Sequence, residues 1–310
     1  MPDRVRRASG GEGLSVAVFV AIALIGGGNA VGVAVSVDEL DPLWTVATRF
    51  LAAGLVFTAL MAVFRIPVPG GRAMIGALIY GAFAFSGAFA FLSWGLRETP
   101  PGTAQIIIAL VPLLTLVLAA AHGLERFTAR AIGGSLIALA GLAFLVNDRL
   151  SADVPLPSLL AVVGGALFLA ESGIVVKLTP RAHPVASNAV GMLGGGLLLL
   201  LLSALVGDNW VAPAQSDTWA AMIFLVLGGS VAVFGLYVFL LGRWTASATS
   251  YTLLLMPIPT VIYSAILTGE PLTPALFAGG AVIIVGVWIG AFARTDAVPR
   301  TEAEGSHTAA

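Results

Sequence analysis

Apolar residues recur in ten long runs along the chain, and each run is about as long as a helix needs to cross a bilayer. A membrane-spanning helix takes roughly 20 apolar residues, and these runs hold roughly 18 to 24. The connections between them are short, so no soluble domain fits between two runs. We therefore predict an all-α membrane protein with ten transmembrane helices near residues 14–37, 42–64, 73–94, 102–121, 130–147, 157–177, 185–207, 218–241, 247–268 and 274–292.

The fourth and fifth runs are repeated as the ninth and tenth. Residues 102–144 can be laid on residues 247–289 without a gap, at a constant offset of 145. Five runs per half is an odd number, so the second half would enter the membrane upside down. We therefore predict two inverted five-helix repeats, as in many secondary transporters whose substrate site lies near the membrane midplane. Identical pairs are Leu110/Leu255, Pro112/Pro257, Thr115/Thr260, Ala120/Ala265, Glu125/Glu270, Thr128/Thr273, Gly134/Gly279 and Gly141/Gly286.

The predicted repeats divide the chain into five parts. The N-terminus carries three arginines before an apolar run that continues to about Val37. Because that run is long enough to span, we interpret it as an uncleaved first helix and not as a secretion signal. The parts are a cytoplasmic N-terminal tail (1–13), the first repeat (14–147), an outer linker (148–156), the second repeat (157–292) and a disordered cytoplasmic C-terminal tail (293–310).

Composition and charge narrow the class of protein. Of the 310 residues only 10% are charged and 58% are hydrophobic, and the mean hydropathy is +1.01. A soluble domain carries about 25% charged residues. The net charge of -1 gives no reason to expect nucleic acid as a partner. Because cysteine is absent, disulfides and thiolate metal sites are excluded.

The distribution of basic residues predicts which side of the membrane the termini and loops face. With the N-terminus in the cytoplasm, twelve of the fifteen Lys and Arg residues fall on the inner side. Only Arg97 and Arg149 fall outside, and Arg49 lies within a run. This bias follows the rule that cytoplasmic loops are enriched in Lys and Arg. We therefore predict a multi-pass membrane protein with both termini cytoplasmic.

A series of motifs runs along the chain at residues 28–31, Pro42, Arg49, Phe50, 99–104, Pro112, 125–128, Gly134, Gly141, Pro257, 269–273, Gly279 and Gly286. This series resembles the drug/metabolite transporter superfamily, and within it the EamA-type permeases of bacteria, which implies a bacterial inner membrane protein. The resemblance covers nearly the whole chain. It implies export or exchange of small metabolites, including amino acids, through a central cavity and driven by a proton or substrate gradient. One departure is in the first run, where the family often has a tryptophan before its glycine pair and this chain has glycines at 26–28.

The most informative polar residues inside runs are Asn29, Arg49, Glu171 and, to a lesser extent, Asn188. An ionisable group at membrane depth costs a few kcal/mol on insertion scales, so it usually faces a cavity or a partner. Laying Pro42 on Pro184 gives an offset of 142 for the first two helices of each half, and Asn29 then falls on Glu171. We expect these two residues to line opposite vestibules of one central cavity.

Glu171 is the only carboxylate inside a predicted span. Burial raises the pKa of a carboxyl group, so Glu171 could bind and release a proton and couple its movement to that of the substrate. Two alternatives stay open: lining of the cavity without coupling, and an ion pair with Lys177 or Arg181.

Arg49 has two alternative roles. It could attract a substrate carboxylate, or it could satisfy backbone carbonyls and an outer acidic residue such as Asp41 or Glu98. A structural or gating role is the one we favour.

Two repeated motifs concern helix geometry. Pro112 and Pro257 each remove a hydrogen bond inside a span, which predicts a kink that serves either as a hinge for gating or as a static bend. The Glu-x-x-Thr turns at 125–128 and 270–273 are best explained as helix caps.

Further polar and aromatic residues could supply the few contacts that a small-molecule cavity uses. Interfacial aromatic residues are common in membrane proteins, so Trp94 could equally be a belt anchor. The candidate substrate-binding residues are Asn29, Tyr80, Ser86, Trp94, Gln105, Glu171, Tyr237, Ser250 and Tyr251.

The combined prediction is a secondary transporter that exports or exchanges small metabolites, with neutral or aromatic amino acids as the first choice. The alternative is efflux of cationic drugs with Glu171 as the counter-charge. The sequence carries no enzyme motif, and we expect no catalytic residues, no metal site and no cofactor. The expected partners are the lipid bilayer and the substrate.

The ten predicted helices should divide into two groups. We expect the first, third, fourth, sixth, eighth and ninth to line the central cavity. The fifth and tenth, with their small-residue faces, should pack at the periphery and could support a homodimer.

Overall fold

The computed structural model describes every residue except 1, 100, 146–153, 269–273 and 292–310, and the described residues contain helices and no strand. The predicted all-α class is therefore confirmed for this part of the chain. Most of the predicted outer linker, the second Glu-x-x-Thr turn and the predicted C-terminal tail lie outside the described residues.

The helices follow one another in the order that the apolar runs predict. They are α1 (Pro2–Val37), α2 (Pro42–Val63), α3 (Gly71–Gly81), η1 (Ala82–Gly87), α4 (Ala88–Gly95), α5 (Pro101–Ile108), α6 (Val111–Ala121), α7 (Ala129–Leu145), α8 (Leu156–Leu178), α9 (Pro184–Val206), α10 (Ser216–Val226), η3 (Leu227–Ala232), α11 (Val233–Leu241), α12 (Ala246–Ser250), α13 (Thr252–Leu255), α14 (Pro257–Thr268) and α15 (Pro274–Ala291).

Eight helical segments among the described residues are long and apolar enough to cross a membrane. They coincide with eight of the ten predicted runs. The fifth and tenth runs hold two shorter apolar helices, which span Ala129–Leu145 and Leu276–Ala291 in the described part. The eight segments are Glu12–Val37, Pro42–Val63, Gly71–Gly95, Ala104–Ala121, Leu156–Leu178, Pro184–Val206, Ser216–Leu241 and Ala246–Leu267.

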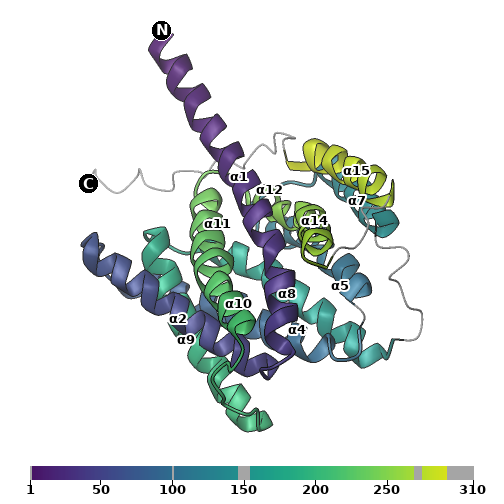
Figure 1. The fold of residues 1–310 in the computed structure, drawn as a ribbon. Helices are drawn as coiled ribbons and strands as arrows, with labels where there is room; N and C mark the ends of the chain where they lie inside the picture. The colour runs from purple at the N-terminus through teal and green to yellow at the C-terminus, as the bar shows by residue number, and fades with distance from the viewer. Residues whose placement is uncertain (1, 100, 146–153, 269–273, 292–310) are drawn as a thin grey trace, which may run out of the picture.

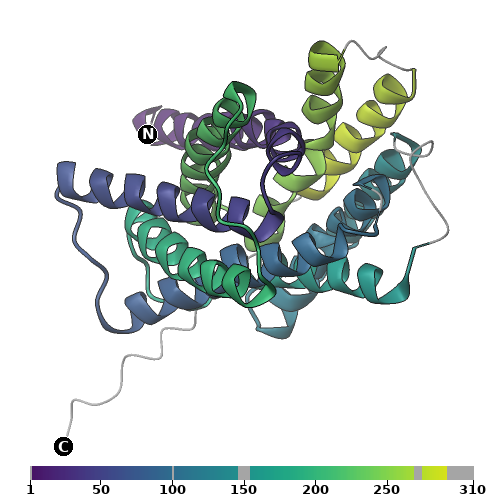
Figure 2. The same cartoon turned by 60° about the horizontal axis from the view of Figure 1, so that its bottom comes forward.

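Glycine brings α7 and α15 into close contact at one edge of the bundle (Figures 1 and 2). A Cβ atom on Gly134 would lie 2.7 Å from the carbonyl oxygen of Gly286, and one on Gly141 would lie 2.9 Å from that of Gly279. Residue numbers rise along one helix as they fall along the other, so the two helices run antiparallel. The four glycines are the ones that the sequence repeats, and small residues are what allow membrane helices to approach so closely.

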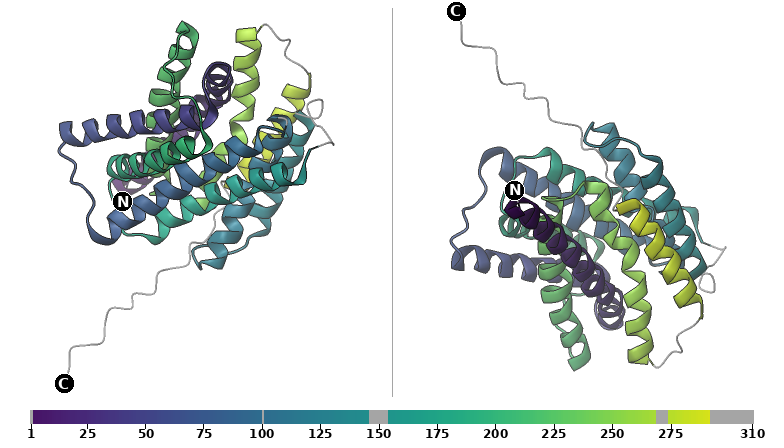
Figure 3. Two further views of the ribbon diagram at one scale, coloured as in Figure 1. Left: turned by 90° about the horizontal axis from the view of Figure 1, so that it is seen from below. Right: turned by 90° about the horizontal axis from the view of Figure 1, so that it is seen from above.

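Helices α2 and α9 form a second close pair at the opposite edge (Figure 3). Gly54 of α2 lies against Leu193, and Gly196 of α9 lies against Leu51. The remaining helices fill the space between these two pairs.

The third and eighth runs each contain one turn of π-helix, which is η1 in the third and η3 in the eighth. The offset between them, from 82 to 227, is the same 145 residues that relates the sequence repeats. A π-helical turn widens the backbone hydrogen-bond spacing, and such turns are frequent at functional sites. No feature of the sequence predicted them.

Both predicted proline kinks are confirmed. Helix α5 ends two residues before α6, which has Pro112 as its second residue, and α13 ends one residue before Pro257 starts α14. Proline has no N–H to donate to the preceding turn, so each helix is interrupted at that point. Whether these interruptions act as hinges stays a prediction.

The glycines at 26–28 do not interrupt α1, which is continuous through them. A Cβ atom on Gly27 would lie 2.5 Å from Cγ of Pro259, and the hydroxyl of Thr260 donates to the carbonyl oxygen of Gly27 at 2.7 Å. The glycines therefore let α1 approach α14 closely.

Candidate functional site

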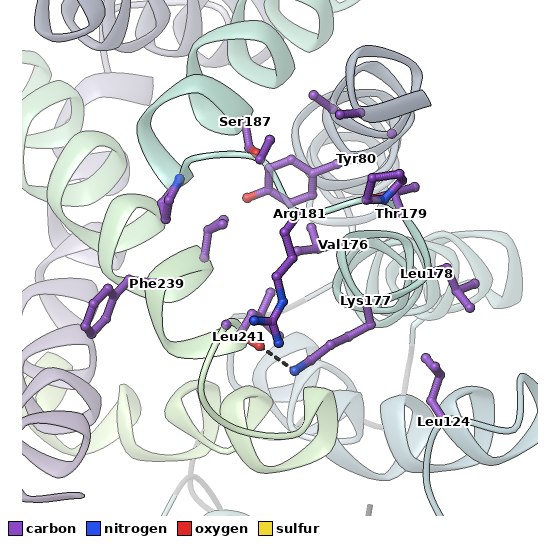
Figure 4. Close-up of a pocket in the computed structure, with 18 of the residues that line it drawn as sticks. Tyr80, Leu124, Val176, Lys177, Leu178, Thr179, Arg181, Ser187, Phe239 and Leu241 are labelled. Carbon is purple, nitrogen blue, oxygen red and sulfur yellow. Dashed lines mark hydrogen bonds between the residues drawn. The ribbon is translucent and has the colours of Figure 1, made fainter. Parts of the chain in front are cut away.

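A cavity of about 980 Å³ opens at one end of the bundle, which we call the basic end because arginine and lysine gather there. Its walls come from the start of α3, residues 123–125, the end of α8 and the segment after it, the start of α9, and the end of α11. Figure 4 shows Tyr80, Ser187 and Arg181 around this space. The volume suits a small molecule, since ligand pockets measure roughly 300 to 1,000 Å³.

Positive charge predominates in the cavity lining. Among the described lining residues, four are basic, namely Arg72, Lys177, Arg181 and Arg243, and one, Glu125, is acidic. A cleft lined by one sign of charge concentrates ions of the opposite sign, so the cavity attracts anions and repels cations.

Two of these charges hold the turn between α11 and α12. The Nζ of Lys177 donates to the carbonyl oxygens of Leu241 and Trp244, at the C-terminal end of α11. The buried carboxylate of Glu125 accepts from the backbone N–H of Ser247 at 3.1 Å and from its hydroxyl, at the N-terminal end of α12. A cation at a helix C-terminus and an anion at an N-terminus both complement the helix dipole.

Capping therefore explains the first Glu-x-x-Thr turn, as the sequence predicted, but the two residues cap different helices. The hydroxyl of Thr128 accepts from the N–H of Ala131 at 3.2 Å and so caps its own helix, α7. Glu125 instead caps α12, which lies 122 residues further along the chain.

Tyr80 forms the inner wall of the cavity, and Asn188 supports it from behind. The hydroxyl of Tyr80 donates to Oδ1 of Asn188 at 3.3 Å, and Nδ2 of Asn188 donates to the carbonyl oxygens of Pro184 at 3.0 Å and Phe234 at 3.1 Å. Both side chains are buried, so their polar atoms need these partners.

An aromatic layer separates this wall from the rest of the bundle. The ring of Phe85 lies 5.2 Å from that of Tyr80, 4.9 Å from that of Phe234 and 4.9 Å from that of Phe50, each measured between ring centroids. These tilted and edge-on arrangements are the ones that aromatic pairs prefer. Of these four rings, that of Tyr80 belongs to a residue that lines the cavity.

Arg49 lies on the far side of the aromatic layer and is only 2% exposed. Its Nε donates to the hydroxyl of Ser230 at 2.7 Å, and its Nη2 donates to the carbonyl oxygen of Gly229 at 2.9 Å and to Oδ1 of Asn29 at 3.4 Å. Nδ2 of Asn29 also donates to Gly229 at 3.4 Å. Arg49 therefore links α1, α2 and the π-helical turn η3, and its bonded partners are neutral groups rather than Asp41 or Glu98.

The opposite end of the bundle, which we call the acidic end, is held by carboxylates of the loops 38–41 and 207–215. Glu39 accepts from the backbone N–H groups of Ala214 and Gln215, just before α10 begins. Hydrogen bonds, first from the side chain of Thr218 and then from the backbone of Ala214, lower the pKa of Glu39.

The same two loops exchange a second set of contacts. Asp208 accepts from the backbone N–H of Trp44 at 3.0 Å, in the first turn of α2, and Asp41 accepts from the backbone N–H of Asn209 at 2.7 Å. The rings of Trp44 and Trp210 stack with their centroids 5.3 Å apart. Each loop thus bonds to the other, which ties the two halves of the chain together.

Glu171 lies on α8 and does not line the cavity. Its Oε1 is 3.6 Å from Nε2 of His122, and the side chains are 22% and 38% exposed. In the structure Glu171 therefore lies beside His122, whereas Asn29 bonds to Arg49. It also gives Glu171 a partner that the sequence analysis did not consider, while Lys177 bonds to carbonyls.

Two further candidate residues are bonded within the protein. The hydroxyl of Tyr251 donates to the carbonyl oxygen of Ala131 at 2.7 Å and lies 2.7 Å from the hydroxyl of Ser135, so it joins the turn after α12 to α7. The hydroxyl of Ser250 donates to the carbonyl oxygen of Ser247 at 2.7 Å. Both side chains are buried.

The other candidates lie apart from one another. Trp94 is 51% exposed near the end of α4, Ser86 is buried within η1, and Gln105 and Tyr237 are half-buried on α5 and α11. Of the nine residues proposed for substrate binding, Tyr80 is the one that lines the cavity.

The lining also differs from the helices that we expected around a central cavity. Helix α1 and the described parts of α5 and α6 contribute no lining residue, whereas α9 contributes Pro184 and Ser187. The reason is that the described lining residues gather at the basic end of the bundle. The sequence analysis did not propose Arg181 for the cavity or Ser230 as a partner of Arg49, although a polar residue in or beside an apolar run was a signal for both.

Comparison with known proteins places the chain among transporters. The family model described as the EamA-like transporter family matches the chain twice, at residues 13–147 and 156–291. A solved structure, described only as "Crystal structure of protein", aligns with a TM-score of 0.77 over 90% of this chain and 97% of its own, at 20% identity. This likeness shows a shared fold.

Three curated relatives are similar over most of their length. The inner membrane transporter YedA of Escherichia coli, itself uncharacterised, is 25% identical over 86% of this chain and 87% of its own. A probable amino-acid metabolite efflux pump of Salmonella typhimurium is 26% identical over 87% of this chain and 92% of its own. A probable terminal-alkyne amino-acid exporter of Streptantibioticus cattleyicolor is 28% identical over 71% of this chain and 74% of its own.

Proposed function

Because the chain belongs to the EamA-like transporter family, we propose that it exports or exchanges small metabolites across a bacterial inner membrane by alternating access. The observation that carries the proposal is the cavity of about 980 Å³ at the basic end, together with the two loops that bond to each other at the acidic end. A path with one open and one closed end is the arrangement that alternating access requires. Amino acids are the substrates we propose first, in line with the names of two relatives.

Ten spans in two inverted repeats fit the geometry. The family model matches twice, and the two π-helical turns share the 145-residue offset of the sequence repeat. The antiparallel contact of α7 with α15 pairs Gly134 with Gly286 and Gly141 with Gly279, as a two-fold axis between inverted copies would. The glycine faces of α7 and α15 contact each other within one chain, so they give no support to the homodimer, which stays a proposal.

We propose that the basic end faces the cytoplasm. It carries Arg72, Lys177, Arg181 and Arg243, whereas the opposite end carries the carboxylates of Glu39 and other acidic residues. This is the asymmetry that the distribution of basic residues in membrane proteins leads us to expect. The cavity would then be open to cytoplasmic substrate.

Proton coupling through Glu171 is a part of the proposal that now involves His122. The two side chains lie 3.6 Å apart between α6 and α8, outside the cavity. Protonation of Glu171 would remove its attraction to a charged imidazole and loosen the contact of these helices. Coupling of this kind would act on helix packing and not on the substrate directly. Efflux of cationic drugs gains no support, because the single lining carboxylate is bonded to Ser247.

The first test is uptake of radiolabelled amino acids into liposomes that contain the purified protein, with and without an imposed pH gradient. We expect saturable accumulation of a few neutral or aromatic amino acids. Empty liposomes and a large cation such as tetraphenylphosphonium serve as controls. Transport of the cation alone, with no amino acid moved under either condition, would contradict the proposed substrate class.

A further inference from the structure

Arg49 is a buried charge without a counter-charge among the described residues. It is 2% exposed, and in the described part of the chain no carboxylate lies within ion-pair distance of its guanidinium. A guanidinium at membrane depth is costly unless polar partners compensate it. Its three hydrogen bonds go to the neutral groups of Ser230, Gly229 and Asn29.

The hydrogen bonds of Arg49 leave part of the guanidinium unused. The group has five N–H donors in a planar fork, and the observed bonds start from Nε and Nη2. The two hydrogens on Nη1 have no partner among the described residues. An oxyanion is the group that best fits this fork, because it accepts charge-assisted hydrogen bonds and neutralises the cation.

The surroundings of Arg49 hold it in one orientation. A Cβ atom on Gly229 would lie 1.8 Å from Oδ1 of Asn29 and 3.1 Å from Nη2 of Arg49, so glycine at this point of η3 makes the contact possible. The Cζ atom of Arg49 also lies 5.2 Å from the ring centroid of Phe50 and 5.8 Å from that of Phe89. Contact with aromatic faces favours a cation and leaves the edge of the guanidinium for a ligand.

A series of aromatic contacts connects the cavity lining to the neighbourhood of Arg49. Tyr80 lines the cavity, its ring contacts that of Phe85, and Phe85 in turn contacts Phe50, the residue next to Arg49. A shift of this aromatic layer would join the cavity to Arg49. The cavity itself carries Arg72 and Arg181, which bond to no described residue and attract anions toward the layer.

We infer that the transported substrate carries a carboxylate group, and that Arg49, held by Asn29, Gly229 and Ser230, binds this carboxylate through its Nη1 edge once the aromatic layer opens. The inference rests on the proposed transport function and names its substrate class. It makes Arg49 a substrate-binding residue, and it predicts that a compound lacking an anionic group is a poor substrate whatever its side chain.

The test compares compounds that differ in one charged group. Liposomes with the purified protein exchange radiolabelled L-phenylalanine, L-leucine and L-threonine against unlabelled competitors. The N-acetyl derivatives keep the carboxylate and lose the ammonium group, and the amides lose the carboxylate. We expect the N-acetyl acids to compete and the amides to compete about 10-fold more weakly, as the loss of a charge-assisted hydrogen bond implies. Equal competition by acids and amides would overturn the inference and leave the transport function standing.

Variants of Arg49 test whether this residue causes the preference for acids over amides. Arg49→Met removes the charge and is expected to lose the preference for acids over amides, while Arg49→Lys keeps the charge and should retain part of it. Arg65→Gln is the matched control, because Arg65 is exposed outside the cavity and should behave like the wild type. An unchanged preference in Arg49→Met would refute the role of this residue. If Arg49→Met does not fold, the preference for acids over amides is measured in Arg49→Lys, where it should be weaker than in the wild type.

A binding measurement keeps the inference separate from the proposed function. Thermal unfolding in detergent is followed with the N-acetyl acids and the amides added at equal concentration. Stabilisation by the acids that is lost in Arg49→Met supports the site even if none of the three amino acids is exchanged. Equal stabilisation by acids and amides contradicts it, with or without transport.

Discussion

The contact between α7 and α15 gives the most direct prediction, because two adjacent glycines of α7 differ in their surroundings. Gly134 faces α15, where an added Cβ would lie 2.5 Å from the backbone nitrogen of Gly290 and 2.7 Å from the carbonyl oxygen of Gly286. Gly133 has no atom within 4 Å of the same position. Alanine at the two sites adds the same methyl group to the same helix.

The structure sets the magnitude of the difference. Ordinary contacts of a Cβ atom begin at 3.4 Å, so Gly134→Ala is about 0.9 Å short of the space that it needs. The obstructing atoms belong to the backbone, so α7 and α15 must separate, and overpacking of this kind costs about 1–3 kcal/mol. Gly133→Ala meets nothing and gains about 0.5–1 kcal/mol from the higher helix propensity of alanine. The two variants should differ in unfolding free energy by about 1.5–4 kcal/mol.

The assay is thermal unfolding of both variants and the wild type in the same detergent, with tryptophan fluorescence as the signal. We expect Gly134→Ala to unfold several degrees below the wild type and Gly133→Ala at or slightly above it. If Gly134→Ala is as stable as Gly133→Ala, the close packing of these two helices is wrong, and with it the support that it gives to an inverted repeat.

Three other predictions concern carboxylates. Because hydrogen bonds lower the pKa of Glu39, the stabilisation from its carboxylate is present above the ordinary pKa of 4.5 and is lost as the pH falls through the lowered pKa. Thermal unfolding across this acidic range should therefore depend less on pH in Glu39→Gln than in the wild type, and an unchanged pH profile would contradict this. Glu125→Ala leaves the backbone N–H of Ser247, in the first turn of α12, without its acceptor, so we expect a loss of about 1–3 kcal/mol in unfolding free energy, measured in detergent against the exposed neighbour Arg126→Ala as control. For Glu171→Gln we expect loss of the proton flux that accompanies the substrate in liposomes, and retention of that flux would exclude Glu171 as the proton carrier.

Much of the fold could be predicted from the sequence because a membrane imposes its requirement on each segment separately. A run of apolar residues of sufficient length indicates a span whatever its neighbours are. The same holds for Pro112 and Pro257, whose missing N–H interrupts any helix, and for Thr128, which caps the helix that follows it. These are local properties, and the structure agrees with them.

The candidate site could be predicted only in part, because it depends on which helices meet and in what register. Arg49 was recognised as an unusual charge inside a span, yet its partner Gly229 lies 180 residues away and the π-helical turn that presents it has no sequence signature that we recognised. Glu171 looked like a cavity residue, but the packing of α6 on α8 places it beside His122.

The sequence by itself therefore determined the class of protein, which is a helical membrane protein with a duplicated arrangement of helices. Hydropathy and residue repeats indicate this class segment by segment along the chain. What only the tertiary structure decided is the function of its charges. Lys177 and Glu125 hold a turn, Glu171 lies beside His122, and Arg49 bonds to neutral groups. The physical reason is that the energy of a buried charge is set by the few groups within a few ångströms of it, and folding brings those groups from distant parts of the chain.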